Sequence, residues 1–150
     1  MSKQNVDLVR SLIPRTDTDI AALYRDESLF EAASEAIQSL LDPGFECVAV
    51  FQGGRTYAGT EGFRRLWLDW LEPWATYRVQ VDEIIDMGDR VVVLVRDRAR
   101  RHDVDAEVEL ISGSVWDFRG GRLLRVRFCS DRKEVFEVAG LPEQDLDTGR

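Results

Sequence analysis

Six aromatic side chains are the residues most able to build a binding site in this sequence. Trp67 and Trp70 are three positions apart, so both indoles lie on one face of a predicted helix, and Trp74 begins the next strand. Three more rings can join them from other elements: Tyr24, Phe63 and Trp116. Together they could line an aromatic pocket for a planar or polycyclic ligand. The alternative is that the rings only fill the core.

The predicted hairpin near the C-terminus places small hydroxyl side chains among large apolar ones on one face of the sheet. If residues 119–121 form a three-residue loop, Trp116 pairs with Leu124, and polar and apolar side chains sort onto opposite faces. The apolar face then holds Val108, Leu110, Ser112, Ser114, Trp116, Leu124, Val126, Phe128 and Ser130. Small hydroxyls among large apolar groups leave room for a ligand and offer it hydrogen bonds. They could equally be small fillers beneath helix side chains.

Other reactive residue types give weaker signals. His102 is the one histidine, it falls in a predicted turn, and no Ser or Cys nucleophile is identifiable beside it. Cys47 and Cys129 show no CxxC spacing, so the sequence contains no zinc or redox motif. We therefore expect no metal site, no cofactor and two reduced thiols.

Hydrophobic periodicity predicts the elements that position these residues. Helical spacing covers residues 5–13, a short segment from 20, residues 28–41, the segment between Thr60 and Pro73, and residues 132–139. Alternation predicts strands over residues 45–51, 74–85, 91–101, 104–118 and 123–130. Helices followed by sequential antiparallel strands indicate an α+β fold. We expect one domain over residues 1–150, with an ordered core at about 5–141 and a loose polar C-terminal tail.

Composition limits the partners of this chain. The 150 residues carry a net charge of −8, which argues against non-specific nucleic-acid binding. No apolar run approaches the roughly 20 residues of a membrane span, and the N-terminus lacks a signal-peptide core, so we expect a cytoplasmic protein. Val91–Val95 is apolar at every position, which indicates a strand covered on both faces. A second subunit is the simplest cover, so the sequence predicts a homodimer with the sheets back to back.

Three segments together resemble a known superfamily: Tyr57–Gly62 entering a helix, Val115–Leu123 around a turn, and Asp131–Leu141 at the last helix. Over residues 5–141 the chain resembles the SnoaL-like branch of the nuclear transport factor 2-like (ketosteroid isomerase-like, polyketide cyclase) superfamily. The resemblance implies a cone-shaped curved antiparallel sheet wrapped around N-terminal helices, a cystatin-like α+β barrel with an internal pocket. Many members are dimers. Isomerases, cyclases, epoxide hydrolases, dehydratases and non-catalytic binders share this fold, so fold alone does not assign function.

The resemblance also implies candidate catalytic residues. The positions that correspond to the steroid isomerase acids fall near Val50 and Ser114, and neither is acidic, which argues against that mechanism. Asp131 resembles the acid/base aspartate of the SnoaL-branch cyclases, where an enclosed carboxyl could remove a proton next to a carbonyl. The alternative is that Asp131 caps the helix that follows it.

Asp97 is the second candidate. Arg96-Asp97-Arg98 resembles the Asp-Arg-Asp set of the superfamily's epoxide hydrolases, with either Asp97 or the two arginines pointing inward. The alternative, which the solvated character of this strand end favours, is an exposed ladder paired with neighbouring acids. The leading hypothesis is a protein that binds a small hydrophobic or polycyclic molecule. Its enzymatic form would use Asp131 or Asp97 as acid/base and Tyr24 or Ser114 as hydrogen-bond donor. The alternative is a non-catalytic ligand-binding or dimerisation module with a sealed core.

Overall fold

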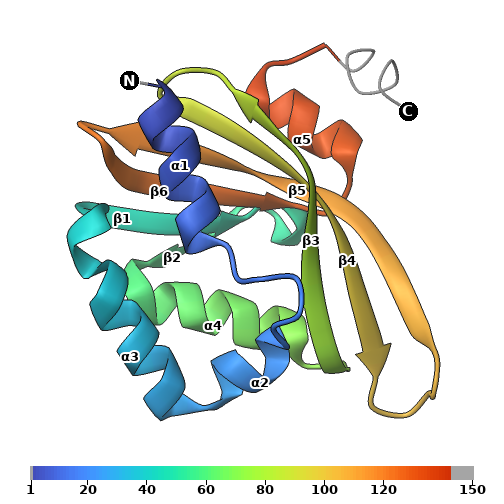
Figure 1. The fold of residues 1–150 in the computed structure, drawn as a ribbon. Helices are drawn as coiled ribbons and strands as arrows, with labels where there is room; N and C mark the ends of the chain where they lie inside the picture. The colour runs from blue at the N-terminus through green and yellow to red at the C-terminus, as the bar shows by residue number, and fades with distance from the viewer. Residues whose placement is uncertain (1, 143–150) are drawn as a thin grey trace.

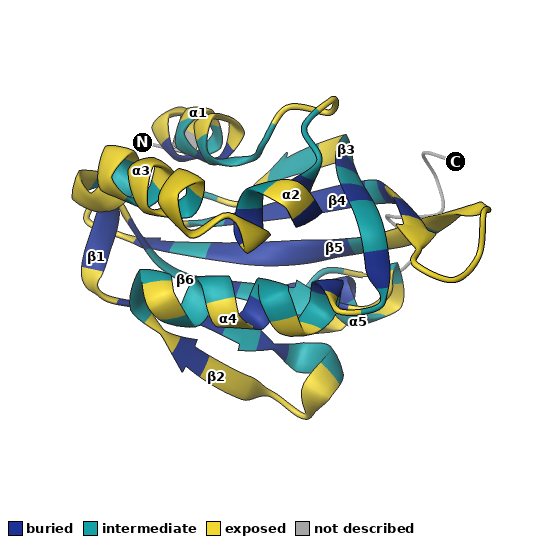
Figure 2. Ribbon diagram, turned by 90° about the horizontal axis from the view of Figure 1, so that it is seen from below, coloured by how far each residue is buried: buried dark blue, intermediate teal, exposed yellow. Residues whose placement is uncertain are grey.

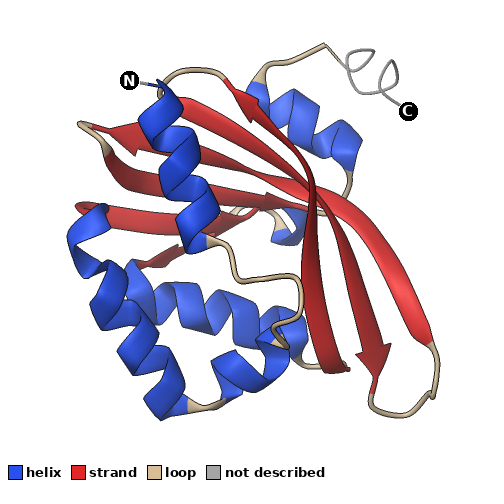
Figure 3. Cartoon of the chain, viewed as in Figure 1, coloured by secondary structure: helices blue, strands red, loops and turns tan. Residues whose placement is uncertain are grey.

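A curved six-stranded sheet with helices against both faces forms the protein, as seen in a computed structural model that describes residues 2–142 (Figures 1 and 3). The helices are α1 (Ser2–Leu12), α2 (Ile20–Arg25), α3 (Glu27–Ile37), α4 (Gly59–Leu71) and α5 (Arg132–Ala139). The strands are β1 (Leu41–Ala49), β2 (Arg55–Ala58), β3 (Trp74–Asp86), β4 (Arg90–Arg101), β5 (Glu107–Arg119) and β6 (Arg122–Cys129). Two short 3-10 turns, 38–40 and 50–52, flank β1. The tail predicted to be loose lies largely outside the described residues.

The order of the strands is β2-β1-β6-β5-β4-β3, and the end strands β2 and β3 do not pair with each other, so the sheet is curved but open. Every pairing is antiparallel except that of β1 with β6, which is parallel. The predicted α+β fold, with helices before a curved sheet, is therefore confirmed, and the sheet is mixed. The sequence did not predict the four-residue strand β2.

The hairpin between β5 and β6 differs from the predicted register. Gly120 and Gly121 both have positive φ angles, 60° and 80°, and form a two-residue turn that other residues adopt with difficulty. Trp116 consequently pairs with Val126, and the predicted pairing with Leu124 is wrong by two positions. A register shift next to the turn, which leaves Leu124 unpaired, restores the alternation. Away from the shift the predicted sorting of faces holds, because a change of two residues keeps each side chain on its face. At the shift, Leu123 joins the inner cluster in place of the predicted Leu124.

The inner face of the sheet carries the larger core, against α1, α2 and α4. Tyr77 and Val93 are each 1% exposed there, and all four tryptophans of the chain belong to this cluster. Most of β4 is buried, and so is the second half of β5, whereas the first half of β5 and most of α3 are exposed (Figure 2). This arrangement leaves helix side chains directly opposite the inward-facing residues of the strands.

The outer face is covered by α5 of the same chain. Val92 and Leu94 of β4 are fully buried in a second cluster, against Val135 and Phe136 of α5. Gly113 allows this close approach, because a Cβ atom there would lie 2.9 Å from Val135 Cγ2. The prediction that a second subunit covers the second face of Val91–Val95 is therefore wrong, because α5 of this chain covers that face. Among residues 2–142, no helix is long and apolar enough to cross a membrane.

Candidate functional site

A cavity of about 240 Å³ lies between the inner face of the sheet and the helices. Its walls are mostly apolar and come from both layers. The helical side contributes Leu12, Ile13, Pro14, Ile20, Tyr24, Phe51, Phe63, Leu66, Trp67 and Trp70. The sheet contributes Tyr77, Val79, Val93, Val95, Asp97, Glu109, Leu110, Ile111, Ser112, Gly113, Ser114, Trp116, Phe128 and Cys129, and Ser130 follows β6. A concave, aromatic site with few polar groups is the usual form of a small-molecule site.

Asp97 is the acid buried in this wall. It is 3% exposed, and its Oδ2 accepts a hydrogen bond of 2.5 Å from the Tyr77 hydroxyl. Its Oδ1 is buried and has no hydrogen-bond partner in the described part of the chain. Burial raises the pKa of Asp97 from 3.8 to about 7, and the hydrogen bond from Tyr77 offsets part of that rise. Asp97 can therefore both give and take a proton near neutral pH.

Tyr77 on β3 holds the carboxyl group of Asp97. Burial, and then the nearby charge of Asp97, raise the pKa of Tyr77 well above 10, so the phenol stays protonated and donates. Its ring packs between Trp67 and Trp74, with centroids 5.8 Å and 6.3 Å away. Tyr77 was not among the site residues predicted from the sequence. The sequence signal for Tyr77 was that it and Val79 alternate with polar residues along the strand. Once the neighbouring strand is paired, this alternation places Tyr77 on the inner face.

Trp67 supplies a second unpaired polar atom. Its Nε1 is buried and has no hydrogen-bond acceptor among residues 2–142. The ring lies 5.6 Å from Tyr24, 5.8 Å from Tyr77 and 5.4 Å from Phe128, measured between centroids. Leaving a buried donor unsatisfied costs about 1–3 kcal/mol. The Trp67 side chain lines the cavity, while its Nε1 atom has almost no accessible surface.

The aromatic and serine residues predicted from the sequence gather at this cavity, with one exception. The residues in its wall are Trp67, Trp70, Phe63, Ser112, Ser114, Trp116 and Phe128. The oxygen of Ser114 accepts a 2.8 Å hydrogen bond from the indole of Trp116. Trp74 is buried but lies outside the wall, with Arg101 over its ring at 5.9 Å.

Tyr24, predicted as a hydrogen-bond donor, belongs to the wall through α2. Its ring contacts Phe30 at 5.3 Å and Phe63 at 6.0 Å. Burial raises the pKa of Tyr24 far above its usual value, with a smaller contribution from Cys47, so the hydroxyl remains neutral. Tyr24 can act in the site only as a neutral donor or acceptor.

Asp131 does not line the cavity. It is exposed at the start of α5 on the outer face, where its side chain accepts a 2.8 Å hydrogen bond from the backbone N–H of Glu134. This is the geometry of a helix N-cap, which was the alternative interpretation of this residue. Asp131 and the cavity therefore lie on opposite sides of the sheet.

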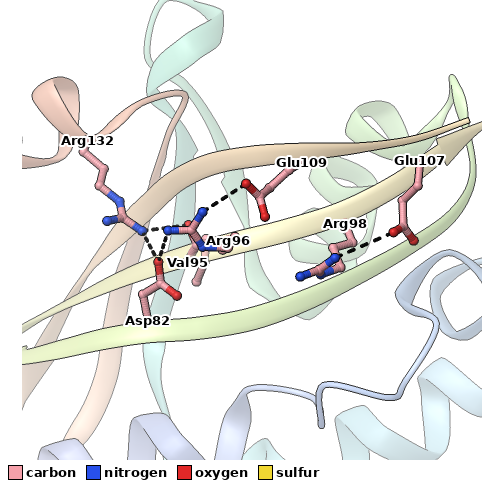
Figure 4. Close-up of polar contacts among 7 residues, drawn as sticks. All are labelled: Asp82, Val95, Arg96, Arg98, Glu107, Glu109 and Arg132. Carbon is pink, nitrogen blue, oxygen red and sulfur yellow. Dashed lines mark hydrogen bonds and ion pairs between the residues drawn. The ribbon is translucent and has the colours of Figure 1, made fainter. Parts of the chain in front are cut away.

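Strand alternation separates the Arg96-Asp97-Arg98 triplet. Asp97 faces the cavity, whereas both arginines lie on the outer face among acidic residues (Figure 4). The ion pairs there are Arg96–Asp82 (3.2 Å), Arg96–Glu109 (3.0 Å), Arg98–Glu107 (3.8 Å) and Arg132–Asp82 (2.7 Å). This is the exposed ladder that the sequence analysis left open, so neither arginine is available to Asp97 inside the cavity.

The ionisable side chains that face the cavity are Asp97, Tyr24 and Tyr77. Glu109 and Cys129 border it from β5 and β6, but the Glu109 carboxylate pairs with Arg96 on the outer face and the Cys129 side chain packs in the outer cluster. No Lys, Arg or His is among the described lining residues. Burial raises the pKa of Cys129 to about 12, so this thiol is not a nucleophile at neutral pH. His102 is exposed in the turn after β4. Within residues 2–142, no three His, Cys, Asp or Glu residues are grouped as metal ligands.

Comparisons with known proteins agree with this architecture. A nuclear transport factor 2-like protein of unknown function from Burkholderia pseudomallei is 21% identical, with a TM-score of 0.60, over 89% of this chain and 95% of that one. A protein from Jannaschia sp. CCS1 described as a SnoaL-like polyketide cyclase is 18% identical, with a TM-score of 0.63, over 93% and 94%. A protein from Catenulispora acidiphila with a ketosteroid isomerase-like fold, in complex with trimethylamine, is 16% identical, with a TM-score of 0.55, over 88% and 97%.

At these identities the solved structures establish the fold alone. The comparison with curated proteins gave no match. The profile of the SnoaL-like domain matches residues 20–126, which is more than half of the chain and includes Asp97, Tyr77 and Trp67. This chain therefore belongs to the SnoaL-like domain family.

Proposed function

We propose that this protein binds a small, largely apolar molecule in its inner cavity and exchanges a proton with it through Asp97. The observation that carries the proposal is the buried carboxyl group of Asp97, which has one oxygen held by Tyr77 and the other unpaired. A carboxyl group with a pKa of about 7 is well matched to acid/base work at neutral pH. The reaction class is cyclase- or isomerase-like proton transfer next to a carbonyl.

Tyr77 has a supporting role in this chemistry. Its hydroxyl fixes the rotamer of Asp97 and stabilises the carboxylate form, while the apolar wall stabilises the neutral form. These opposed effects keep both protonation states accessible. Asp131, which caps α5 on the outer face, has no part in the proposed step.

Carbon–proton exchange tests the proposal without knowledge of the natural substrate. The probe is 2-tetralone, a two-ring ketone with acidic hydrogens next to its carbonyl, and NMR in D2O follows its deuteration. We expect the protein to accelerate exchange, with a rate that rises with pH and levels off above about 7 as Asp97 ionises. Asp97→Asn should lower the rate about 100-fold or more, and Asp131→Asn is the matched carboxylate control, expected to leave it unchanged.

Two results would count against proton transfer by Asp97. If Asp97→Asn and the wild type exchange deuterium equally, another group is the base. If 2-tetralone binds without accelerated exchange, the protein is a ligand-binding module rather than an enzyme. Absence of any tryptophan fluorescence change with ketones and hydroxyaromatics of one to four rings would favour the sealed core instead.

The proposed site needs only one chain, because every group that it uses comes from this chain. We retain the homodimer and the cytoplasmic location as predictions. The outer face beyond α5 offers a charged ladder with Ile111, 43% exposed, beside it, as a surface for a second copy. Sedimentation velocity at micromolar concentration measures the oligomeric state, and a species of about 17 kDa would contradict the dimer.

A further inference from the structure

The outer face of β3 and β4 carries a group of arginines that the proposed function does not use. Alternation along β4 places Arg96, Arg98 and Arg100 on this face. Cross-strand pairing adds Arg78 of β3, which lies directly opposite Arg98. Like charges in directly opposite positions destabilise a sheet, so folding alone does not explain this pair.

The three acids beside these arginines are already paired. Arg96 contacts Asp82 at 3.2 Å and Glu109 at 3.0 Å. Arg98 contacts Glu107 at 3.8 Å, and both side chains are about half exposed (Figure 4). Such a long and exposed ion pair adds little stability, so the Arg98 guanidinium can turn to another anion.

Arg78 and Arg100 have no ion pair in the part of the chain that the structure describes. They lie diagonally across the two strands, and Arg98 is the neighbour of both. Diagonal positions are within reach of long side chains, so three guanidinium groups can meet at one point on the surface. Thr76, opposite Arg100, adds a hydroxyl beside them. We call Arg78, Arg98 and Arg100 the arginine cluster; it stands on a chain with a net charge of −8.

We propose that the arginine cluster binds a phosphate group, either as the free ion or as part of a phosphorylated small molecule. A guanidinium presents two parallel N–H donors that match two oxygens of a phosphate. A tetrahedral phosphate, which carries nearly two negative charges at neutral pH, can face more than one of these forks at once. Its charge also offsets the repulsion between Arg78 and Arg98, which a neutral ligand leaves in place.

This site is separate from the inner cavity. Asp97 and Ala99 alternate with the arginines along β4, and their side chains lie on the opposite face of the sheet. A phosphate bound at the arginine cluster therefore does not enter the cavity, and its binding does not depend on acid/base chemistry by Asp97. Asp97→Asn should accordingly bind phosphate as the wild type does, so this inference and the proposed function can fail separately.

A 31P NMR titration at low ionic strength tests the site, with inorganic phosphate and phenyl phosphate as probes. Arg78→Gln and Arg98→Gln should each lower the affinity about tenfold, because each removes a charged donor. Arg10→Gln removes the same charge from an exposed position on α1 and is the matched control, expected to leave the affinity unchanged. Tighter binding of phenyl phosphate than of inorganic phosphate would identify the ligand as an ester, and the reverse order would identify the free ion.

Two results would overturn the phosphate site. The first is an affinity that is the same in Arg78→Gln, Arg98→Gln and the wild type, because the phosphate would then bind elsewhere. The second concerns a rival occupant of this face, which sedimentation velocity on the same proteins detects. A dimer that dissociates in Arg78→Gln, together with no phosphate binding by the wild type, would show that these arginines contact a second copy of the chain.

Discussion

Asp97 is a residue whose environment opposes its ionisation, and the consequence is measurable without any ligand. Its pKa is about 7 in the folded protein against 3.8 for an ordinary aspartate, so the folded state binds this proton more tightly than the unfolded state. The contribution of Asp97 to stability therefore falls as pH rises from about 4 to 7, by about 1.4 kcal/mol per pH unit, and is constant above that range. The total cost of ionising Asp97 is about 4 kcal/mol.

Asp97→Asn removes this titration, so the variant should become progressively more stable than wild type between pH 5 and 7. The measurement is the free energy of unfolding by urea at pH 5, 6, 7 and 8, for both proteins. Asp42, whose pKa the Arg119 guanidinium holds below its usual range, stabilises the folded state above acid pH in both proteins and cancels in the difference. A difference that does not change with pH would show that Asp97 has an ordinary pKa.

The sequence identified Asp97 as a candidate but could not show which way it faces. In a strand, alternation can turn either Asp97 or its two arginine neighbours inward, and only the pairing of β4 with β3 places Asp97 beside Tyr77. The aromatic wall was easier to predict, because Trp67 and Trp70 share a helix face whatever the fold. The unpaired state of Trp67 Nε1 depends on every neighbour of that atom, so no local pattern could reveal it.

At the scale of elements, α5 depends on the residue that begins it. Asp131 accepts a hydrogen bond from the backbone N–H of Glu134 in the first turn of the helix. The helix α5 covers the outer face of β4 and β5. Asp131→Ala should lower the free energy of unfolding by about 1 kcal/mol, which is typical for loss of an N-cap. Asp131→Asn should lower it less, because Asn also caps well.

The same pair of variants separates capping from catalysis. Urea denaturation measures the cap, and the 2-tetralone exchange rate measures the catalytic role. We expect Asp131→Ala to be less stable yet fully active under conditions where it remains folded. A loss of exchange in the folded Asp131→Ala protein would restore this residue as a catalytic candidate.

Elements were predictable where local patterns are strong. The limits of α5 match the predicted 132–139, because Asp131 and Gly140 mark both ends. The parallel pairing of β1 with β6 was not predictable, since it joins segments far apart in the chain. The hairpin register was predicted wrongly for a different reason. A two-residue glycine turn followed by a register shift gives nearly the same alternation of polar and apolar residues as a three-residue loop.

At the scale of the whole molecule, one sheet separates two hydrophobic clusters and belongs to both. Val91 and Val93 of β4 lie in the inner cluster, whereas Val92 and Leu94 lie in the outer cluster with α5. Loss of packing on one face therefore weakens the strands that support the other. The predicted single domain should accordingly unfold in one cooperative transition.

Phe136→Ala tests this coupling, because Phe136 is 1% exposed in the outer cluster and all four tryptophans lie in the inner cluster. The truncation should lower the free energy of unfolding by about 4 kcal/mol, as is typical of a buried phenylalanine. Tryptophan fluorescence and far-ultraviolet circular dichroism should report the same reduced midpoint in urea. Leu29→Ala on α3, where the side chain is 53% exposed, is the control and should change the midpoint little. A fluorescence midpoint that stays at the wild-type value in Phe136→Ala would mean that the two clusters unfold independently.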